Sequence, residues 1–383
     1  MVVICDTPTL TDICRRLSET EFVTVDTEFM RERTYWARLC LVQVAGPNES
    51  HAIDALAEGI DLTPLFELLD NPKVLKVFHA ARQDLEIFNC LMGHLPAPLF
   101  DTQVAAMVCG FGESAGYETL VTKLTKATVD KGSRFTDWSL RPLSERQIKY
   151  ALADVIHLRE VYEKLRKRLH TNGNASWVDE EMATLTAAKT YAFDPALAYR
   201  RIKTRSISPR FLSVLRELAA WREREAQRLD LPRNRVVRDE ALAEIAHQMP
   251  QTVEELARTR SLGRKLAEDE RGTQILAAIA AGMALPEADC PRPPPRVDLP
   301  RGLGPVVDLL KVLLKMKCEQ FDVAQKLIAS SSDIDQIAAF GEDADVPALH
   351  GWRREVFGEV ALKLSAGAIA LAADRKGLRT VPL

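Results

Sequence analysis

Short apolar runs alternate with helical patterns through the first half of the chain. Stretches 22–29, 39–46, 51–56 and 74–80 have the apolar, β-branched character of strands, whereas 62–70 and 81–93 have helical spacing. Three strands before the first long helix predict hairpin pairing followed by parallel additions. The pattern therefore predicts an α/β domain built on a mixed sheet flanked by helices.

Strand patterns stop at about residue 196, and the rest of the chain has helical spacing. A run dense in proline at 286–305 cannot continue a helix and predicts a linker. On either side of it, ILAAIAAGMAL (275–285) and VALKLSAGAIAL (360–371) are similar, which indicates a diverged repeat of one small helical module. We therefore expect an α/β domain over 1–170, a helical connector over 171–205, a helical module over 206–286, a proline-rich linker over 287–302 and a second, diverged helical module over 303–383.

The strand FVTVDTEF (22–29) contains two carboxylates, Asp26 and Glu28. Because strand side chains alternate between faces, these two project from the same face, together with Thr24. Ionised carboxylates side by side repel each other, and their burial without a cationic partner is costly. A solvated face of an edge strand would also explain the pair, so other carboxylates have to decide between the two interpretations.

Three further side chains can join this pair. Asp84 follows the strand at 74–80 and stands near the start of a helix. A capping-box pattern at 144–147 opens a long helix, on which Tyr150 and Asp154 share one face. Each has an ordinary structural explanation by itself, but four carboxylates and a phenol on converging elements suit two Mg²⁺ or Mn²⁺ ions about 4 Å apart. Such ions would offset the repulsion within the strand pair.

Composition narrows the class of protein. A chain that is 46% hydrophobic and 27% charged is typical of a soluble globular protein. Its apolar runs are too short to cross a membrane, and its start lacks the basic region of a signal peptide, so we expect a cytoplasmic protein. The seven cysteines are scattered and indicate neither zinc nor a disulfide framework. Residues 196–285 carry 17 Lys and Arg against 12 Asp and Glu, which fits either polyanion binding or a solvated helical surface.

Several stretches resemble the ribonuclease D family. VDTEF, HAARQDLEIF and YALADV are similar to the three exonuclease motifs of the DEDD superfamily, in the subgroup with tyrosine in the third motif. DWSLRPLSERQ and the two helical modules, which resemble HRDC domains, extend the resemblance over nearly the whole chain, although the second module departs more from the HRDC pattern. The resemblance implies a ribonuclease H-like first domain and a metal-dependent 3′→5′ exoribonuclease. It would release 5′-mononucleotides from structured RNAs with 3′ extensions, such as tRNA precursors.

The resemblance also implies a role for each site residue. Asp26 would bridge two metal ions, and Glu28 and Asp154 would complete the site of the ion that carries the attacking water. Asp84 would support the second ion through water. Tyr150 would orient the attacking water, because a phenol with a pKa near 10 is a poor base at neutral pH. We expect the protein to act as a monomer.

Further residues are candidates for contact with RNA. Aromatic and apolar side chains after the catalytic strand could stack on terminal bases, and basic side chains near DWSLRP and in the first helical module could contact phosphates. We interpret His79 and Asp101, which lie close to the motifs, as structural. The candidates for stacking are Phe29, Met30, Tyr35 and Trp36, and those for phosphate contact are Lys131, Arg134, Arg141, Arg233, Arg235 and Arg238.

Two alternatives stay open at this point. The motif residues act on the phosphate and give no information about recognition of a 2′-hydroxyl. A DNA-directed 3′→5′ exonuclease would therefore contain the same motifs. A nucleic-acid-binding scaffold with an inactive nuclease domain is the other alternative. The intact set of four carboxylates and one tyrosine argues against that scaffold.

Overall fold

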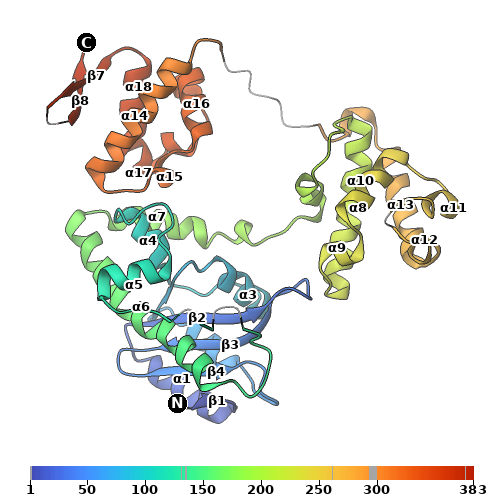
Figure 1. Cartoon of the computed structure of the whole chain (residues 1–383), viewed down its shortest axis with the longest axis horizontal. Helices are drawn as coiled ribbons and strands as arrows, with labels where there is room; N and C mark the ends of the chain where they lie inside the picture. Colours follow the sequence, from blue (N-terminus) through green and yellow to red (C-terminus); the bar gives the residue numbers. More distant parts are fainter. Residues whose placement is uncertain (1, 131, 134–135, 261, 293–299, 376) are drawn as a thin grey trace. The chain divides into compact units, whose positions relative to one another are not determined.

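The computed structural model describes residues 2–130, 132–133, 136–260, 262–292, 300–375 and 377–383 (Figure 1). Contacts divide the chain into two compact units. One comprises Met1–Glu28, Cys40–Ala187 and Val297–Leu383, and the other comprises Phe29–Leu39 and Ala188–Arg296. Within the described ranges, no helix combines the length and the apolar character needed to cross a membrane.

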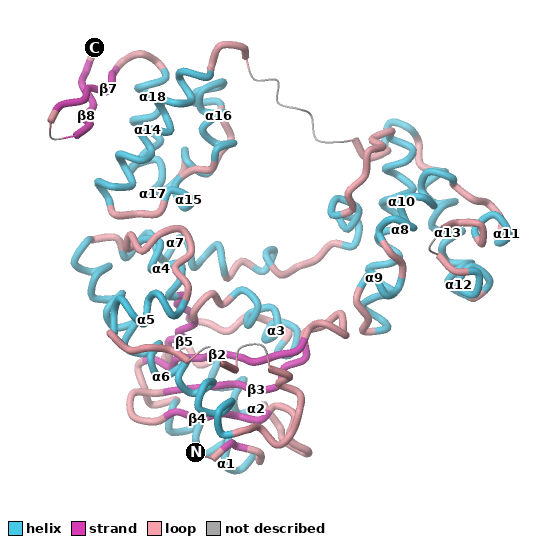
Figure 2. Tube along the Cα trace, in the orientation of Figure 1, coloured by secondary structure: helices cyan, strands magenta, loops and turns pink. Residues whose placement is uncertain are grey.

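The first unit contains an α/β domain with a six-stranded sheet in the order β1-β4-β3-β2-β5-β6, and Figure 2 labels its four middle strands. Strand β3 runs antiparallel to β4, whereas the pairs β1–β4, β2–β5 and β5–β6 are parallel, so the predicted mixed sheet is confirmed. The elements are β1 Val3–Ile4, α1 Thr7–Leu17, β2 Phe22–Met30, β3 Arg38–Ala45, β4 Ser50–Asp54, α2 Thr63–Asp70, β5 Leu75–Phe78, α3 Arg82–Met92, β6 Leu99–Asp101, α4 Thr102–Val108, α5 Tyr117–Thr125, α6 Glu145–Asn172 and α7 Ala175–Leu185.

Helix α6 packs against the face of β2 that carries the two carboxylates. Its predicted capping box is present, with the Ser144 hydroxyl accepting from the Gln147 amide and the Gln147 side chain accepting from the Ser144 amide. Thr24, buried in β2, donates from its hydroxyl to the backbone oxygen of Val155 at 2.8 Å. Because Thr24, Asp26 and Glu28 share a face, this bond brings the middle of α6 over the carboxylates.

The second unit is a helical module with its own apolar core. Its elements are α8 Pro209–Leu229, α9 Arg233–Val236, α10 Asp239–Gln248, α11 Val253–Leu256, α12 Arg264–Glu268 and α13 Glu270–Ala284. Segment Phe29–Leu39, which follows the catalytic strand in sequence, belongs to this unit. The amides of Tyr35 and Trp36 both donate to Oδ1 of Asp230 at 3.0 Å, which fastens the segment to the end of α8.

The second helical module repeats the element order of the first. A long helix, a one-turn helix and a ten-residue helix follow one another in both, and both long helices end at a left-handed aspartate, Asp230 and Asp322. This order supports the predicted repeat. The elements are α14 Gly304–Phe321, α15 Gln325–Ile328, α16 Ser331–Phe340, α17 Gly351–Arg353, α18 Glu359–Ser365, β7 Ile369–Asp374 and β8 Gly377–Pro382.

The prediction that strands stop at residue 196 is wrong at the end of the chain. Helix α18 ends at Ser365, and Gly367 adopts a left-handed φ of 73° that closes the helix. Strands β7 and β8 then form an antiparallel hairpin. The stretch 369–371, read as the end of a repeated helix, is therefore the start of a strand, because the glycine ends the helix four residues earlier than in the first module's pattern.

The second helical module docks on the α/β domain within the first unit. The rings of Trp177 and Trp352 stack with centroids 4.8 Å apart and planes 13° from parallel. The buried Glu181 of α7 accepts from Nε1 of Trp352 at 3.1 Å and from Arg353 at 2.5 Å. The amide of Ala324 donates to the backbone oxygen of Met107 at 2.9 Å. Apolar, charged and backbone contacts together hold this module in place.

Candidate active site

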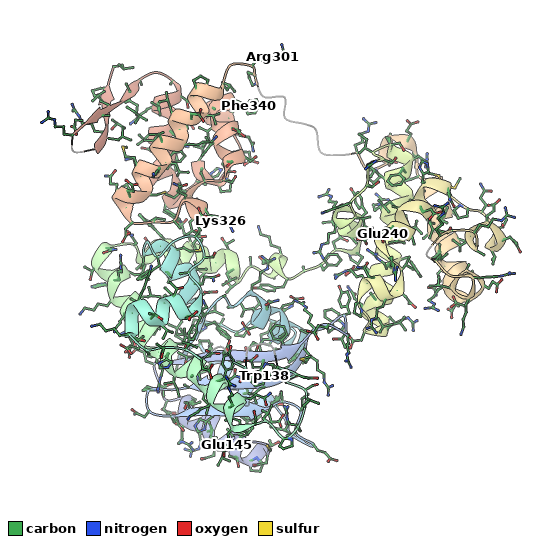
Figure 3. All side chains as sticks on the ribbon, in the orientation of Figure 1. Trp138, Glu145, Glu240, Arg301, Lys326 and Phe340 are labelled. Carbon is green, nitrogen blue, oxygen red and sulfur yellow. The ribbon has the colours of Figure 1, made fainter. Side chains whose placement is uncertain are left out.

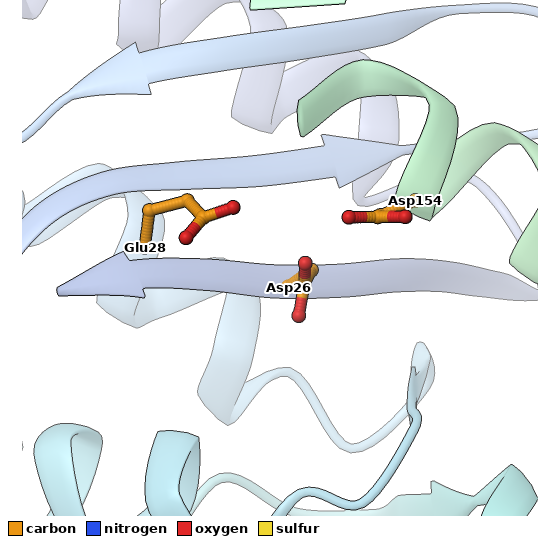
Figure 4. Close-up of side chains that lie close together, drawn as sticks. All are labelled: Asp26, Glu28 and Asp154. Carbon is orange, nitrogen blue, oxygen red and sulfur yellow. The ribbon is translucent and has the colours of Figure 1, made fainter. Parts of the chain in front are cut away.

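Three carboxylates converge between β2 and α6. Asp26 and Glu28 come from β2 and Asp154 comes from α6, and each offers an oxygen within 4.8 Å of the others. Figure 4 shows the Glu28 and Asp154 side chains directed toward each other, with Asp26 between them. All three are partly buried, so the repulsion among them is not fully screened by water. The predicted convergence of these three residues is present in the structure.

Burial disfavours ionisation of two carboxyl groups at the site, Asp26 and Asp84. Desolvation raises the pKa of Asp26 from 3.8 to about 6. The pKa of Asp84 is also raised, first by burial and then by the negative charge of Asp26. A nearby cation would have the opposite effect on both groups. A bound cation would therefore stabilise the ionised form of these carboxylates.

Asp84 is close to this cluster but is held separately. It lies in the first turn of α3, and its carboxylate accepts a hydrogen bond from the hydroxyl of Thr27, on the other face of β2. The chain reaches α3 through Ala80, whose φ of 56° is left-handed. Asp101 stabilises this turn by accepting from the amides of Ala80 at 3.1 Å and Ala81 at 2.8 Å. The structural interpretation of Asp101 is confirmed, and its role is to fix the turn before Asp84.

A cavity of about 370 Å³ adjoins the carboxylates and is lined by Asp26, Tyr150 and Asp154. Tyr117, which the sequence analysis did not single out, lines it too and donates from its hydroxyl to the backbone oxygen of Asp154. The hydroxyl thereby supports the turn of α6 that presents Asp154. Nothing in the GYETL stretch distinguishes Tyr117 from a core aromatic, so motif spacing could not have found it.

His79 lines the same cavity. Its Nδ1 lies 3.0 Å from the hydroxyl of Thr102, and its ring lies 5.5 Å from that of Tyr117. Burial lowers the pKa of His79, which favours the neutral imidazole. These contacts support the structural interpretation of His79.

The predicted phosphate contacts near DWSLRP differ in outcome. Lys131 and Arg134 lie outside the described residues. All five N–H groups of Arg141 are used within the protein: two bind the buried Asp54 at 2.6 and 2.5 Å, and three bind backbone oxygens of Cys40, Trp138 and Leu140. This geometry gives Arg141 a structural role, fastening its loop to the edge of β3 and β4, and does not support the expected phosphate contact.

The predicted contacts in the second unit separate into structural and exposed groups. Arg233 binds Glu223 through two nitrogens, each at 2.6 Å, and covers the ring of Tyr35 at 4.7 Å. These bonds and those of Tyr35 to α8 explain both residues as parts of the module's own packing. Phe29 and Met30 are partly buried, whereas Trp36, Arg235 and Arg238 are exposed.

The donor set fits hard divalent cations. Carboxylate oxygens at this spacing are the ligands that Mg²⁺ and Mn²⁺ prefer, and among the described residues no soft sulfur ligand belongs to the cluster. The raised pKa values of Asp26 and Asp84 indicate the same need for positive charge. The residues present can thus hold the metal that phosphodiester chemistry requires.

An acidic cluster between a strand and a helix of this mixed α/β fold fits a metal-dependent nuclease domain. Comparison with known proteins specifies the class. A family model described as 3′-5′ exonuclease matches residues 1–170, and one described as HRDC domain matches 211–279.

The relatives are ribonucleases D. The chain is 52% identical to ribonuclease D of Gluconacetobacter diazotrophicus over 381 residues, covering 100% of this chain and 97% of the relative. It is 52% identical to that of Granulibacter bethesdensis, covering 97% and 94%. The crystal structure of Escherichia coli RNase D, described as an exoribonuclease involved in structured RNA processing, superposes with a TM-score of 0.80 at 31% identity, covering 96% of this chain and 98% of that one. This chain belongs to the ribonuclease D family and is a 3′→5′ exoribonuclease.

Proposed function

We propose that this chain trims the 3′ ends of structured RNAs, such as tRNA precursors, as a cytoplasmic monomer that uses two Mg²⁺ or Mn²⁺ ions. The observation that carries the proposal is the convergence of Asp26, Glu28 and Asp154 within 4.8 Å, beside a cavity that Tyr150 also lines. Bound divalent cations supply a water that ionises near neutral pH and positive charge at the phosphate.

Each site residue has a distinct task in this proposal. Asp26, Glu28 and Asp154 would hold the metal ions, and Asp26 lies between the other two carboxylates. Asp84 would support a bound ion through water, with its carboxylate oriented by the hydroxyl of Thr27. Tyr150 orients the attacking water from the wall of the cavity. The backbone bond from Tyr117 acts indirectly, by holding the turn that presents Asp154.

The remaining RNA contacts are proposed on exposure and charge. Arg235 and Arg238 are exposed on the basic second unit and are suited to phosphates. Phe29 and Met30 continue the catalytic strand and are suited to contact with terminal bases. Lys131 and Arg134 remain candidates by sequence alone.

The test uses a 5′-labelled tRNA precursor with a short 3′ extension, an unstructured RNA of the same length and a DNA of the precursor's sequence, each incubated with Mg²⁺, with Mn²⁺ and with EDTA. The expected result is shortening of the precursor from its 3′ end with either ion, no reaction in EDTA, and none with Asp26→Ala. Folding of that variant is verified by circular dichroism, so that lost activity reports the site.

Each contrary outcome identifies a different error. Trimming of RNA in EDTA, or by folded Asp26→Ala, would contradict the metal assignment. Equal trimming of DNA would show that the cavity does not distinguish the 2′-hydroxyl. Trimming of unstructured RNA with no preference for the tRNA precursor would refute the proposed substrate.

A further inference from the structure

A second cavity lies on the C-terminal helical module, away from the carboxylates. Its volume is about 520 Å³, and it is lined by α14, α15, the start of α16 and one residue of the α/β domain, Glu113. Three of its lining residues are lysines, Lys311, Lys315 and Lys326. Figure 3 labels Lys326 on this module.

The lysines give the groove a positive charge that is only partly used within the protein. Lys311 and Lys315 are four residues apart on α14 and share one face. Lys311 has a weak partner, Asp308, at 3.6 Å. Lys315 and Lys326 are exposed, and among the described residues neither forms an ion pair. Residues 303–383 contain 10 Lys and Arg against 11 Asp and Glu, and three of those lysines line this groove beside one carboxylate, Glu113.

The anion attraction comes from these side chains and not from a helix end. The N-terminus of α16, which borders the groove at Ser330 and Ser331, is satisfied by its own capping box between Ser330 and Asp333. Hydroxyl and amide groups of Ser331 and Gln325 line the wall beside the lysines. Such a mixture of ammonium and neutral polar groups is suited to a phosphodiester backbone.

The groove and the catalytic cavity border one loop. Glu113 lines the groove, and Gly116 to Thr119 line the catalytic cavity. Glu113 and Gly116 are three positions apart in the chain, so their Cα atoms are at most about 11 Å apart. The bond from Ala324 to Met107 and the ion pair of Arg168 with Asp322 hold the module against this part of the α/β domain. An RNA strand with its 3′ end in the cavity would therefore need few nucleotides to reach the lysines.

We propose that the Lys311–Lys315–Lys326 groove binds the RNA backbone several nucleotides upstream of the bond that is cleaved. The proposal rests on the exoribonuclease function and assigns the second helical module a share in substrate binding. Two observations carry it, namely the concentration of lysines in a groove of defined volume and the loop that the groove shares with the catalytic cavity.

The test compares wild-type protein with Lys315→Gln/Lys326→Gln on two RNAs with the same 3′ sequence. One RNA has about two nucleotides and is too short to reach the groove from the cavity, and the other has about twenty. The expected result is a KM for the longer RNA that rises roughly tenfold, with kcat unchanged and the shorter RNA unaffected. The slope of log affinity against log salt for the longer RNA should fall by about 1.4, because each phosphate contact on a single strand contributes about 0.7.

Two controls separate the groove from general charge and from misfolding. Lys363→Gln/Arg375→Gln removes the same charge from exposed positions of the same module outside the groove and should leave KM for both RNAs unchanged. Lys315→Arg/Lys326→Arg keeps the charge and should retain most of the wild-type affinity for the longer RNA.

The proposal is overturned if the groove variant matches wild type on the longer RNA, if the outside variant weakens binding equally, or if both RNA lengths are affected alike. A wild-type protein that trims neither RNA would instead contradict the exoribonuclease function itself. The two failures are thus distinguishable in one set of assays.

Discussion

Removal of the Glu181 carboxylate should undock the second helical module. Glu181 is 10% exposed at its side chain and Arg353 is 19% exposed, so their ion pair is largely shielded from water. In Glu181→Ala, Nε1 of Trp352 and the guanidinium of Arg353 lose their acceptor. A lost hydrogen bond to a charged group costs about 1.5–3 kcal/mol, and an unsatisfied buried donor costs about 1–3 kcal/mol.

These costs overlap, and Arg353 keeps a bond to the backbone oxygen of Leu327, so we expect a net loss of about 3 kcal/mol. Glu181→Gln keeps an acceptor oxygen at nearly the same place but removes the charge. Its expected loss is about half as large. The graded pair of variants tests the ion pair separately from the hydrogen bond to the indole.

Urea unfolding followed by tryptophan fluorescence is a suitable assay, because the stacked rings of Trp177 and Trp352 report the docked state. Asp179→Ala, an exposed change on the same helix, is the matched control and should shift stability by less than about 0.5 kcal/mol. If the free energy of unfolding of Glu181→Ala equals that of Asp179→Ala, the assigned role of the ion pair is refuted.

Three further predictions concern the α/β domain. Asp26→Asn should stabilise the metal-free protein at neutral pH by up to about 3 kcal/mol, the value that separates a pKa of 3.8 from one of about 6. The sign follows because the pKa of Asp26 is higher in the folded than in the unfolded protein: the ionised carboxylate destabilises the fold fully above pH 6, and this cost disappears as the pH falls to 3.8. The stability gain of Asp26→Asn, measured by urea unfolding in EDTA, should therefore vanish over the same pH range. A gain that grows on acidification would contradict this prediction. Tyr150→Phe should lower kcat on the order of a hundredfold with little change in KM, since the hydroxyl orients water and does not bind RNA; a selective rise in KM in steady-state assays would argue for substrate contact instead. Arg141→Met should destabilise the domain by about 3 kcal/mol, because it leaves the Asp54 carboxylate buried without its cation, and urea unfolding unchanged from wild type would show that the loop has another anchor.

The sequence predicted those elements whose patterns are long. Strands β2, β3, β4 and β5 were predicted close to their observed bounds, and the start of helix α6 was predicted at its capping box, because alternation and capping residues are local properties. Strands β1 and β6 have two and three residues, too few to form a pattern. The hairpin of β7 and β8 was missed because its alanine-rich first strand has the composition of a helix.

The carboxylate cluster was predictable because its residues lie at fixed spacings on regular elements. Asp26, Glu28 and Asp154 project from a strand face and a helix face whose periods are known. Partners of basic residues were not predictable, because they come from distant parts of the chain. Arg141 was predicted to contact phosphate from its sequence neighbourhood, whereas in the structure it binds Asp54, 87 residues away. The support that Tyr117 gives to Asp154 is a contact of the same kind, since 37 residues separate them.

Binding of Mn²⁺ to the protein is the most direct test of the central claim that the carboxylate cluster holds the catalytic metal. Isothermal titration of wild-type protein and of Asp154→Asn with Mn²⁺ measures it without any substrate. The account predicts saturable binding to the wild type and an affinity at least about tenfold lower in the variant, because one of three converging carboxylates is lost. Equal affinity in the two proteins would place the metal elsewhere and contradict the account.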